Sequence, residues 1–465
     1  MSILQFAIVP RRPCYTWQPS RCFGTKRGVQ SPFSQAQPPP AKNQRQVEPG
    51  LRTPLTNLAY NGPVTLFESP ELRGATMTGN RSGLTLLDVA VVLFCILIVM
   101  ALLIPAVTGP HSGGRRNQCS IQLKNLGLAA IQYENTRKKL PGWAMEFGHF
   151  GWDPETETVL SPLIDPSADS PEASSRNLSP HRKIGTWAVA LLPWLDAQPT
   201  YEHWTEDRYP ILTRAEGSTT GFSGRGFHPL AAPNLAIMQC PSDPTQSEDD
   251  GRNSYVANAG VFFPPRDMIT GQHAIFHPGG TTKTVTFAES MSNEFGAFGN
   301  QVSARLESSG EDEHVPIAKP IRLEDFRDGA GNTVLFSESL HALSWHRSGF
   351  ANDKDLIFEN HPDEVLYPTL SRFTNTMVWH GVDWSNGKQP REIHRINGER
   401  TLTETMQMSR TNVADLARPS SAHAAGVNVS MADGGTRFIS ETIDMRVWQS
   451  LMTPRGHEPI SDDEI

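Results

Sequence analysis

The sequence lacks the spaced residues on which the widely recognised catalytic and metal-binding motifs depend. It contains no H-E-x-x-H, no G-x-S-x-G, no Walker loop and no G-x-G-x-x-G, so zinc proteases, serine hydrolases and nucleotide-binding enzymes are not indicated. None of the five cysteines forms a C-x-x-C pair, which is the usual signal for a structural zinc site or thioredoxin-like chemistry. We therefore expect no catalytic residues, no metal and no cofactor.

Basic residues are also too few for general binding to nucleic acid. The chain has 41 Lys and Arg against 49 Asp and Glu, a formal net charge of −8, whereas affinity for a phosphate backbone requires a basic surface. Hydrophobic residues make up 38%, and the chain contains 37 Gly and 37 Pro. This composition predicts a loop-rich globular protein with enough apolar residues for a core and no nucleic-acid partner.

The N-terminal segment, residues 1–80, differs from the rest of the chain. Residues 1–83 contain 10 Lys or Arg, 3 Glu and 11 Pro, with three prolines in a row at positions 38–40. No apolar period runs through this stretch, so it predicts a disordered, Pro-rich basic tail. Three interpretations remain open: a solvated linker, a cytosolic interaction arm, or a misannotated start with translation beginning at Met77.

A long apolar run follows at residues 89–107, with the sequence VAVVLFCILIVMALLIPAV. Its 19 residues carry no charge, and as a helix they would extend about 28 Å, close to the hydrocarbon core of a bilayer at roughly 30 Å. A cleaved secretory signal has a shorter apolar region, and a buried core helix normally keeps a polar face. Residues 81–107 are therefore expected to contain a membrane-spanning helix.

The residues before this run contain a small residue and one acid, Gly83-Leu84-Thr85-Leu86-Leu87-Asp88. This pattern resembles the prepilin-type N-terminal cleavage and methylation motif of type IV pilins and type II secretion pseudopilins. The resemblance implies that a prepilin peptidase cuts after Gly83, that Leu84 becomes the methylated first residue, and that Asp88 replaces the usual Glu and neutralises the amino terminus of a neighbouring subunit. It also implies a helix bend at Pro105.

The apolar run ends in a segment rich in Gly and Pro. Residues 108–114, TGPHSGG, predict a hinge that interrupts the helix. A second helix is expected from Arg115, because apolar residues recur at helical spacing until Leu140-Pro141-Gly142. Its apolar stripe is expected to pack on the sheet of an exported domain, residues 115–465, and consists of Cys119, Leu123, Leu126, Ala130 and Tyr133.

Further motifs follow in one order along the chain: RRNQC at 115–119, LKNLGLA at 123–129, WAVALLPWLDAQPTY at 187–201, CPSDP at 240–244, NSYVANAG at 253–260 and DFRDGAGNTVLFSE at 325–338. The last is His423, then nine residues, then Asp433-Gly434. Together they resemble a large uncharacterised bacterial family of prepilin-like proteins with a C-terminal H-x9-DG motif.

The H-x9-DG residues have structural roles as their first interpretation. Alternating residues at 427–432, a turn at Asp433-Gly434 and a return at 436–440 are typical of a β-hairpin. His423 precedes the first strand, and is read as a satisfied loop or core histidine, with a ligand or surface-binding role as the alternative. Cys119 and Cys240 are the only cysteines in the predicted exported region. They form a candidate disulfide, with two buried thiols as the alternative.

These observations predict an α+β protein: a pilin-like N-terminal membrane helix, then a helix packed on a largely antiparallel β-sheet in a loop-rich domain. The expected function is that of a non-enzymatic, pseudopilin-like surface or secretion-system protein, with its N-terminus cytoplasmic and its C-terminal domain exported. Its partners would be the membrane, a prepilin peptidase and other pilin-like subunits. The alternative is a membrane-tethered domain that binds an extracellular glycan or solute.

Overall fold

The structure is a computed structural model. It describes residues 85–108, 111–153, 158–159, 180–212, 227–244, 251–264, 271–276, 282–303, 315–349, 368–381, 391–399 and 406–456. The expected tail at 1–80 and the two residues at the expected cut, Gly83 and Leu84, lie outside these ranges.

The core of the fold is a five-stranded sheet with strand order β10-β5-β9-β11-β12. Only β10 and β5 pair in parallel, and the other neighbours in this sheet are antiparallel. Every residue of the three central strands is buried, because both faces of the sheet are covered. The strands are β5 (Tyr255–Val261), β9 (Val334–Glu338), β10 (Thr376–Trp379), β11 (Gly426–Met431) and β12 (Thr436–Ser440).

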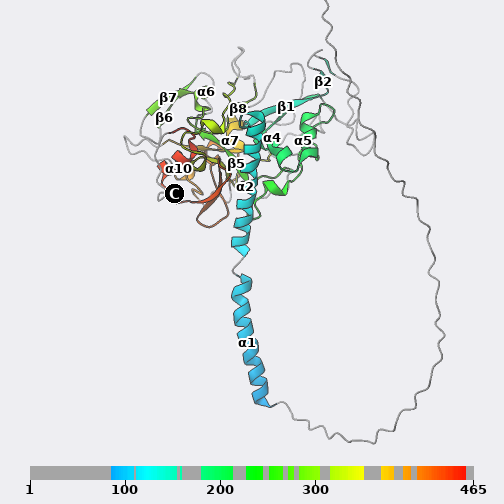
Figure 1. Ribbon diagram of the computed structural model, residues 1–465, viewed down its shortest axis with the longest axis vertical. Coiled ribbons are helices and arrows are strands. Elements are labelled where there is room, and N and C mark those ends of the chain that lie inside the picture. The colour runs from blue at the N-terminus through cyan, green and yellow to red at the C-terminus, as the bar shows by residue number, and fades with distance from the viewer. Residues whose placement is uncertain are drawn as a thin grey trace, which may run out of the picture. The chain divides into compact units, whose positions relative to one another are not determined.

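Helix α2 (His111–Arg137) packs against this sheet (Figure 1). The predicted apolar stripe is confirmed, because all five of its residues are buried. Gly127 lies against Ser430 of β11, at a distance that leaves no room for a Cβ atom. On the same sheet face, the Tyr255 hydroxyl donates a 2.6 Å hydrogen bond to Oε1 of Gln122 on α2. The helix is therefore held against β11 and β5 by close backbone approach and by a buried polar contact.

The predicted hairpin near the C-terminus is confirmed. Strands β11 and β12 are antiparallel, with Val427 opposite Ile439 and Ser430 opposite Thr436. Gly434 has a φ of +84°, a conformation that favours glycine, and Oδ1 of Asp433 accepts a 2.7 Å hydrogen bond from the Gly435 amide. Asp433-Gly434 therefore makes the chain reversal.

Smaller sheets and short helices surround this core. One sheet has strand order β4-β1-β8, with β1 (Ala144–Phe150) antiparallel to β4 (His181–Gly185) and parallel to β8 (Asn300–Gln301). The two-stranded pairs are β2 (Trp152–Asp153) with β3 (Thr158–Val159), and β6 (Gln272–Phe276) with β7 (Thr282–Thr286). The helices are α4 (Trp187–Leu191), α5 (Gln198–Thr205), α6 (Phe287–Ser290), α7 (Pro368–Thr374), α9 (Val413–Leu416) and α10 (Met445–Met452), with 3-10 turns at Leu192–Trp194, Ala236–Met238, Leu323–Asp325, Ala330–Asn332 and Glu392–His394. The fold is α+β, with mixed and antiparallel sheets.

Part of the expected hinge at 108–114 is helical. Helix α1 runs from Leu86 to Thr108, through Pro105, and α2 begins at His111 instead of Arg115. Gly113 and Gly114 are thus helical, and a Cβ atom at either position would meet nothing within 4 Å. A glycine in a helix costs only about 1 kcal/mol relative to alanine, which the long packed helix that follows can offset.

Helix α1 begins with a local polar cap. The amide and hydroxyl of Thr85 donate to Oδ2 of Asp88 at 3.0 and 2.8 Å, and the Asp88 amide donates to the Thr85 hydroxyl at 3.3 Å. This reciprocal arrangement is a capping box. Within the residues whose side chains are described, no helix reaches the length and mean hydropathy needed to cross a membrane.

Lys183 of β4 is fully buried, and its Nζ donates to the carbonyl oxygens of His203 and Glu206 at 2.9 and 2.6 Å. Burial lowers the pKa of Lys183 from 10.5 to about 7. Between these two values the unfolded chain binds more protons than the folded chain, so the free energy of unfolding rises as the pH rises through that window.

We expect the free energy of unfolding to increase by about 2 kcal/mol between pH 7 and pH 9, since each unit of pKa difference corresponds to roughly 1.4 kcal/mol. Urea unfolding at several pH values measures the slope of the free energy of unfolding against pH. Lys183→Met should flatten it, whereas Lys319→Met, at an exposed lysine, should leave it unchanged. Equal slopes in the wild type and in Lys183→Met would contradict the assignment.

Candidate functional site

A disulfide joins helix α2 to the loop that precedes β5. Cys119 lies on α2, Cys240 follows the 3-10 turn at Ala236–Met238, and their Cα atoms are 5.1 Å apart. Both residues are buried. The bond fixes the helix to a segment 121 positions away in the sequence.

The CPSDP motif forms the turn that presents Cys240. The Cys240 amide donates a 3.0 Å hydrogen bond to Oγ of Ser254, and this hydroxyl donates a 2.8 Å bond to Oδ2 of Asp243. The Asp243 amide in turn donates to the Cys240 carbonyl at 3.0 Å. The Ser and Asp of this region therefore orient the cysteine through buried polar contacts.

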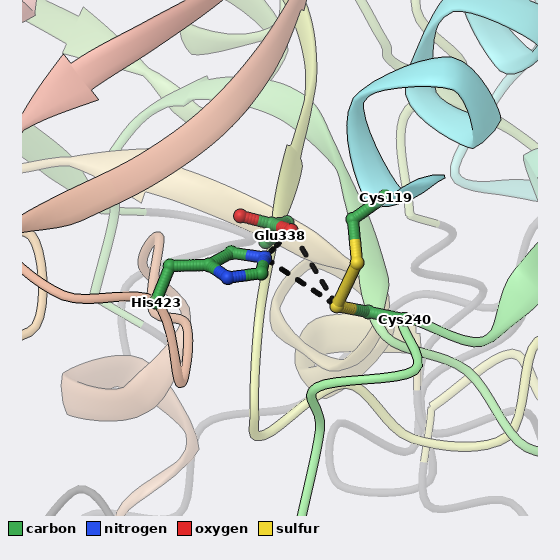
Figure 2. A group of neighbouring side chains, drawn as sticks. All are labelled: Cys119, Cys240, Glu338 and His423. Atoms are coloured by element: carbon green, nitrogen blue, oxygen red, sulfur yellow. Dashed lines mark hydrogen bonds and ion pairs between the residues drawn. A yellow bond between two sulfur atoms is a disulfide. The ribbon is translucent and has the colours of Figure 1, made fainter. Parts of the chain in front are cut away.

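His423 and Glu338 lie beside the disulfide (Figure 2). Nε2 of His423 is 3.0 Å from Oε1 of Glu338, and Sγ of Cys240 is 3.6 Å from each of these two atoms. The four residues Cys119, Cys240, Glu338 and His423 are all buried, and their potential ligand atoms lie within 4.8 Å of one another. Helix α2, the Cys240 loop, strand β9 and the loop before β11 each contribute one of these side chains.

Glu338 ends the motif at 325–338, but the sequence assigned it no functional role. It is the last residue of β9 and is 2% exposed. Its Oε2 accepts a 2.7 Å hydrogen bond from the Asn428 amide, and its Oε1 accepts a 3.1 Å bond from Asn428 Nδ2. Its place at the end of an apolar strand could have indicated a role, because a carboxylate buried there requires hydrogen-bond partners.

The loop that carries His423 is also fixed by hydrogen bonds. The His423 amide donates to Oγ of Ser421 at 3.1 Å, and that hydroxyl donates to the Gly426 carbonyl at 2.7 Å. His423 is 6% exposed, and its ring faces Glu338 and Cys240. His423 is therefore a buried histidine whose Nε2 contacts Glu338 and Cys240.

The two ends of the H-x9-DG motif do not form one site. His423 lies before β11, whereas Asp433-Gly434 follows it, and Gly434 lies near Leu128 of α2. The five residue steps from Gly426 to Met431 span about 17 Å, at roughly 3.4 Å per residue. The motif therefore marks the two ends of one buried strand: a polar cluster at one end and a turn at the other.

Two hollows adjoin the cluster formed by Cys119, Cys240, Glu338 and His423. A small one of about 10 Å³ is lined by Cys240, Asp243, Ser254, Glu338, Ser339, Leu340, Ser420, Ser421 and Ala422. A larger groove of about 390 Å³ is lined by Gly113, Arg115, Arg116, Ser242, Ala422, His423 and Ala424. His423 thus lines the groove while its Nε2 faces the disulfide.

Two of the remaining predicted residues belong to α1. Asp88 caps α1, and Pro105 is an internal residue of that helix. The structure therefore brings together Cys119, Cys240 and His423 among the residues selected from the sequence, and adds Glu338 and Asn428 to them.

Comparisons with known proteins give a family without an assigned activity. No curated protein and no solved structure matches the chain. Residues 6–59 match a second family model, described as "Protein of unknown function (DUF1589)". Residues 112–446, nearly three quarters of the chain, match the model SBP_bac_10 and include the disulfide, Glu338, His423 and the hairpin. The chain therefore belongs to the family described as "Protein of unknown function (DUF1559)".

Proposed function

We propose that this chain is a non-enzymatic, pseudopilin-like surface or secretion-system protein, processed by a prepilin peptidase after Gly83 and anchored in the cell membrane by α1. The observation that carries the proposal is the apolar surface of α1. Every large apolar side chain from residue 86 to residue 100 is exposed, from 45% at Ile98 to 89% at Leu86. Each such side chain left in water forgoes about 1.5–3 kcal/mol of the free energy that burial would supply. This surface therefore requires lipid or partner helices.

The disulfide supports export of the C-terminal domain. Disulfides persist in oxidising compartments and are rare in the cytosol, and Cys119 and Cys240 both lie within the α+β domain. Under the proposal, the N-terminus stays on the cytoplasmic side, and the domain that begins with α2 is exported. Prepilin peptidase and other pilin-like subunits would be its partners.

Asp88 has a local role that fits with processing. Its carboxylate already caps the helix that begins two residues after Leu84. In the processed chain, a methylated amino terminus at Leu84 would lie one residue before this cap. We propose that the same carboxylate neutralises the amino terminus of a neighbouring subunit when subunits assemble.

Processing is tested by mass spectrometry of the N-terminal peptide of the native protein extracted from membranes. We expect a chain that begins at Leu84 and is heavier by one methyl group. Gly83→Leu should abolish the cut and leave a longer chain. The matched control Gly79→Leu changes a glycine that the motif does not use, and should be processed normally.

A native chain that retains the residues before Leu84, with Gly83→Leu of equal length, would overturn the pseudopilin proposal. The second candidate function, a tethered domain that binds a glycan or solute, would then take its place. The observation that favours it is the groove of about 390 Å³, since Arg115, Arg116, Ser242 and His423 give it cationic and polar groups suited to an anionic ligand.

A further inference from the structure

We propose that the cluster of Cys119, Cys240, Glu338 and His423 is a redox-switched metal site, which binds a divalent transition-metal ion such as Zn²⁺ when the disulfide is reduced. The donor set is one that zinc uses: two thiolate sulfurs, an imidazole nitrogen and a carboxylate oxygen. All four residues are buried and come from separate elements that the fold holds together. This inference does not depend on the proposed anchoring.

Three of the distances between the ligand atoms already approach those of a tetrahedral site, and all four atoms lie within 4.8 Å of one another. With Zn–S of about 2.3 Å and Zn–N or Zn–O of about 2.0–2.2 Å, the edges of a tetrahedron are roughly 3.3–3.8 Å. The edges from Sγ of Cys240 to Nε2 of His423 and to Oε1 of Glu338 are both 3.6 Å, and the edge between those two atoms is 3.0 Å. The two sulfurs must separate to about 3.8 Å, which requires that their bond be broken.

A shell of hydrogen bonds orients the ligands. Asn428 donates to Glu338 through its amide and its side chain, and Ser421 positions the backbone of His423. Ser254 accepts from the Cys240 amide. Such outer partners set the direction of a metal ligand and hold it when the ion is absent.

The redox step balances as follows. A dithiol reductant breaks the Cys119–Cys240 bond by exchange, becomes a cyclic disulfide itself and leaves two protein thiols. The metal ion then replaces the two thiol protons, which pass to solvent. Oxidation of the thiols by a disulfide oxidant reverses the sequence and releases the ion. The groove beside His423 and the small hollow beside Glu338 and Cys240 adjoin the cluster.

The test uses the full-length chain in detergent, with Cys14, Cys22 and Cys95 replaced by serine. A phosphine reduces the disulfide, and Co²⁺ is titrated into the reduced and the oxidised protein. We expect the reduced protein to bind one Co²⁺ per chain, with a sulfur-to-cobalt charge-transfer band and the strong visible bands of tetrahedral cobalt, and Zn²⁺ to displace it. The oxidised protein should show neither band.

Two ligand variants distinguish this site from adventitious binding by two thiols. His423→Gln and Glu338→Gln should each weaken Co²⁺ binding by more than the roughly 10–100-fold that loss of an outer-shell partner costs. His149→Gln, at a histidine outside the cluster, should not change it. X-ray absorption of the Zn²⁺-loaded protein should show two sulfur and two nitrogen or oxygen neighbours, a measurement that needs no variant.

The proposal fails if the reduced protein binds no Co²⁺, or if the oxidised protein binds it equally well. It also fails if the ligand variants, with folding verified by circular dichroism, bind with unchanged affinity and unchanged bands. The residues would then serve only to bury and support a structural disulfide.

Discussion

Replacing Cys119 and Cys240 with alanine is expected to lower the free energy of unfolding by about 4–5 kcal/mol. The disulfide closes a loop of 121 positions, and the chain-entropy model gives about this value for a loop of that length. The bond also fixes α2 to the sheet domain at the point where the four-residue cluster lies. Urea unfolding of the full-length chain in detergent, at equal protein concentration, measures the change as a shift in the midpoint.

The control for this prediction is Cys95→Ser, which removes a free cysteine in α1. Its unfolding midpoint in urea should match that of the wild type. Reduction of the wild type before unfolding should lower stability in the same direction as the double alanine variant. A double variant that unfolds within 1 kcal/mol of the wild type would show that the packing of α2, and not the bond, holds this helix in place.

Glu338→Ala is expected to lower the free energy of unfolding by about 3–5 kcal/mol. The carboxylate accepts hydrogen bonds from the amide and side chain of Asn428, and it contacts Nε2 of His423. Its removal leaves these buried donors without an acceptor, and each unsatisfied group costs about 1–3 kcal/mol. The gain from no longer burying a carboxylate offsets part of this loss. Thermal and urea unfolding both measure the effect.

Two further variants test whether the loss of stability is specific to the Glu338 carboxylate. Glu338→Gln retains the shape and one acceptor but places an NH₂ group among donors. It should therefore lower the free energy of unfolding by less than Glu338→Ala does. Glu324→Ala, at a side chain that is 70% exposed, should change stability by less than about 0.5 kcal/mol. A Glu338→Ala protein as stable as Glu324→Ala would mean that the cluster adds nothing to folding.

Local patterns were sufficient to predict the helix and the hairpin. The spacing of Cys119, Leu123 and Leu126 identifies a buried helical face, because residues three and four apart lie on the same side of a helix. Alternation at 427–431 and the Asp433-Gly434 turn identify β11, β12 and the turn between them, because a glycine with positive φ reverses the chain at low cost. These features depend on residues close together in the sequence.

The burial of the polar residues of the candidate site was harder to predict from the sequence. Asn428 alternates with the valines of β11, which is typical of an exposed position, yet it is 3% exposed. It faces α2 on a sheet that is covered on both sides, where it satisfies Glu338. Alternation reveals which residues share a face, but burial of that face depends on what packs against it.

The start of α2 also differs from the start predicted from composition. Composition predicts a break at residues 108–114, and the structure begins the helix at His111. Glycine disfavours a helix by only about 1 kcal/mol per residue, an amount that a long packed helix can overcome. Local propensity therefore placed the start of this helix four residues too late.

The sequence by itself determined the α+β class, the apolar helix after Asp88, the packed stripe of α2, the terminal hairpin and membership of its family, because each of these is encoded by periodicity, by turn residues or by motifs in a fixed order. Only the tertiary structure decided that the carboxylate of Glu338 meets His423 and the Cys119–Cys240 bond. Successive members of this group lie 121, 98 and 85 positions apart along the chain, and only the pairing of β9 with β11 and the packing of α2 on the sheet bring their atoms within reach.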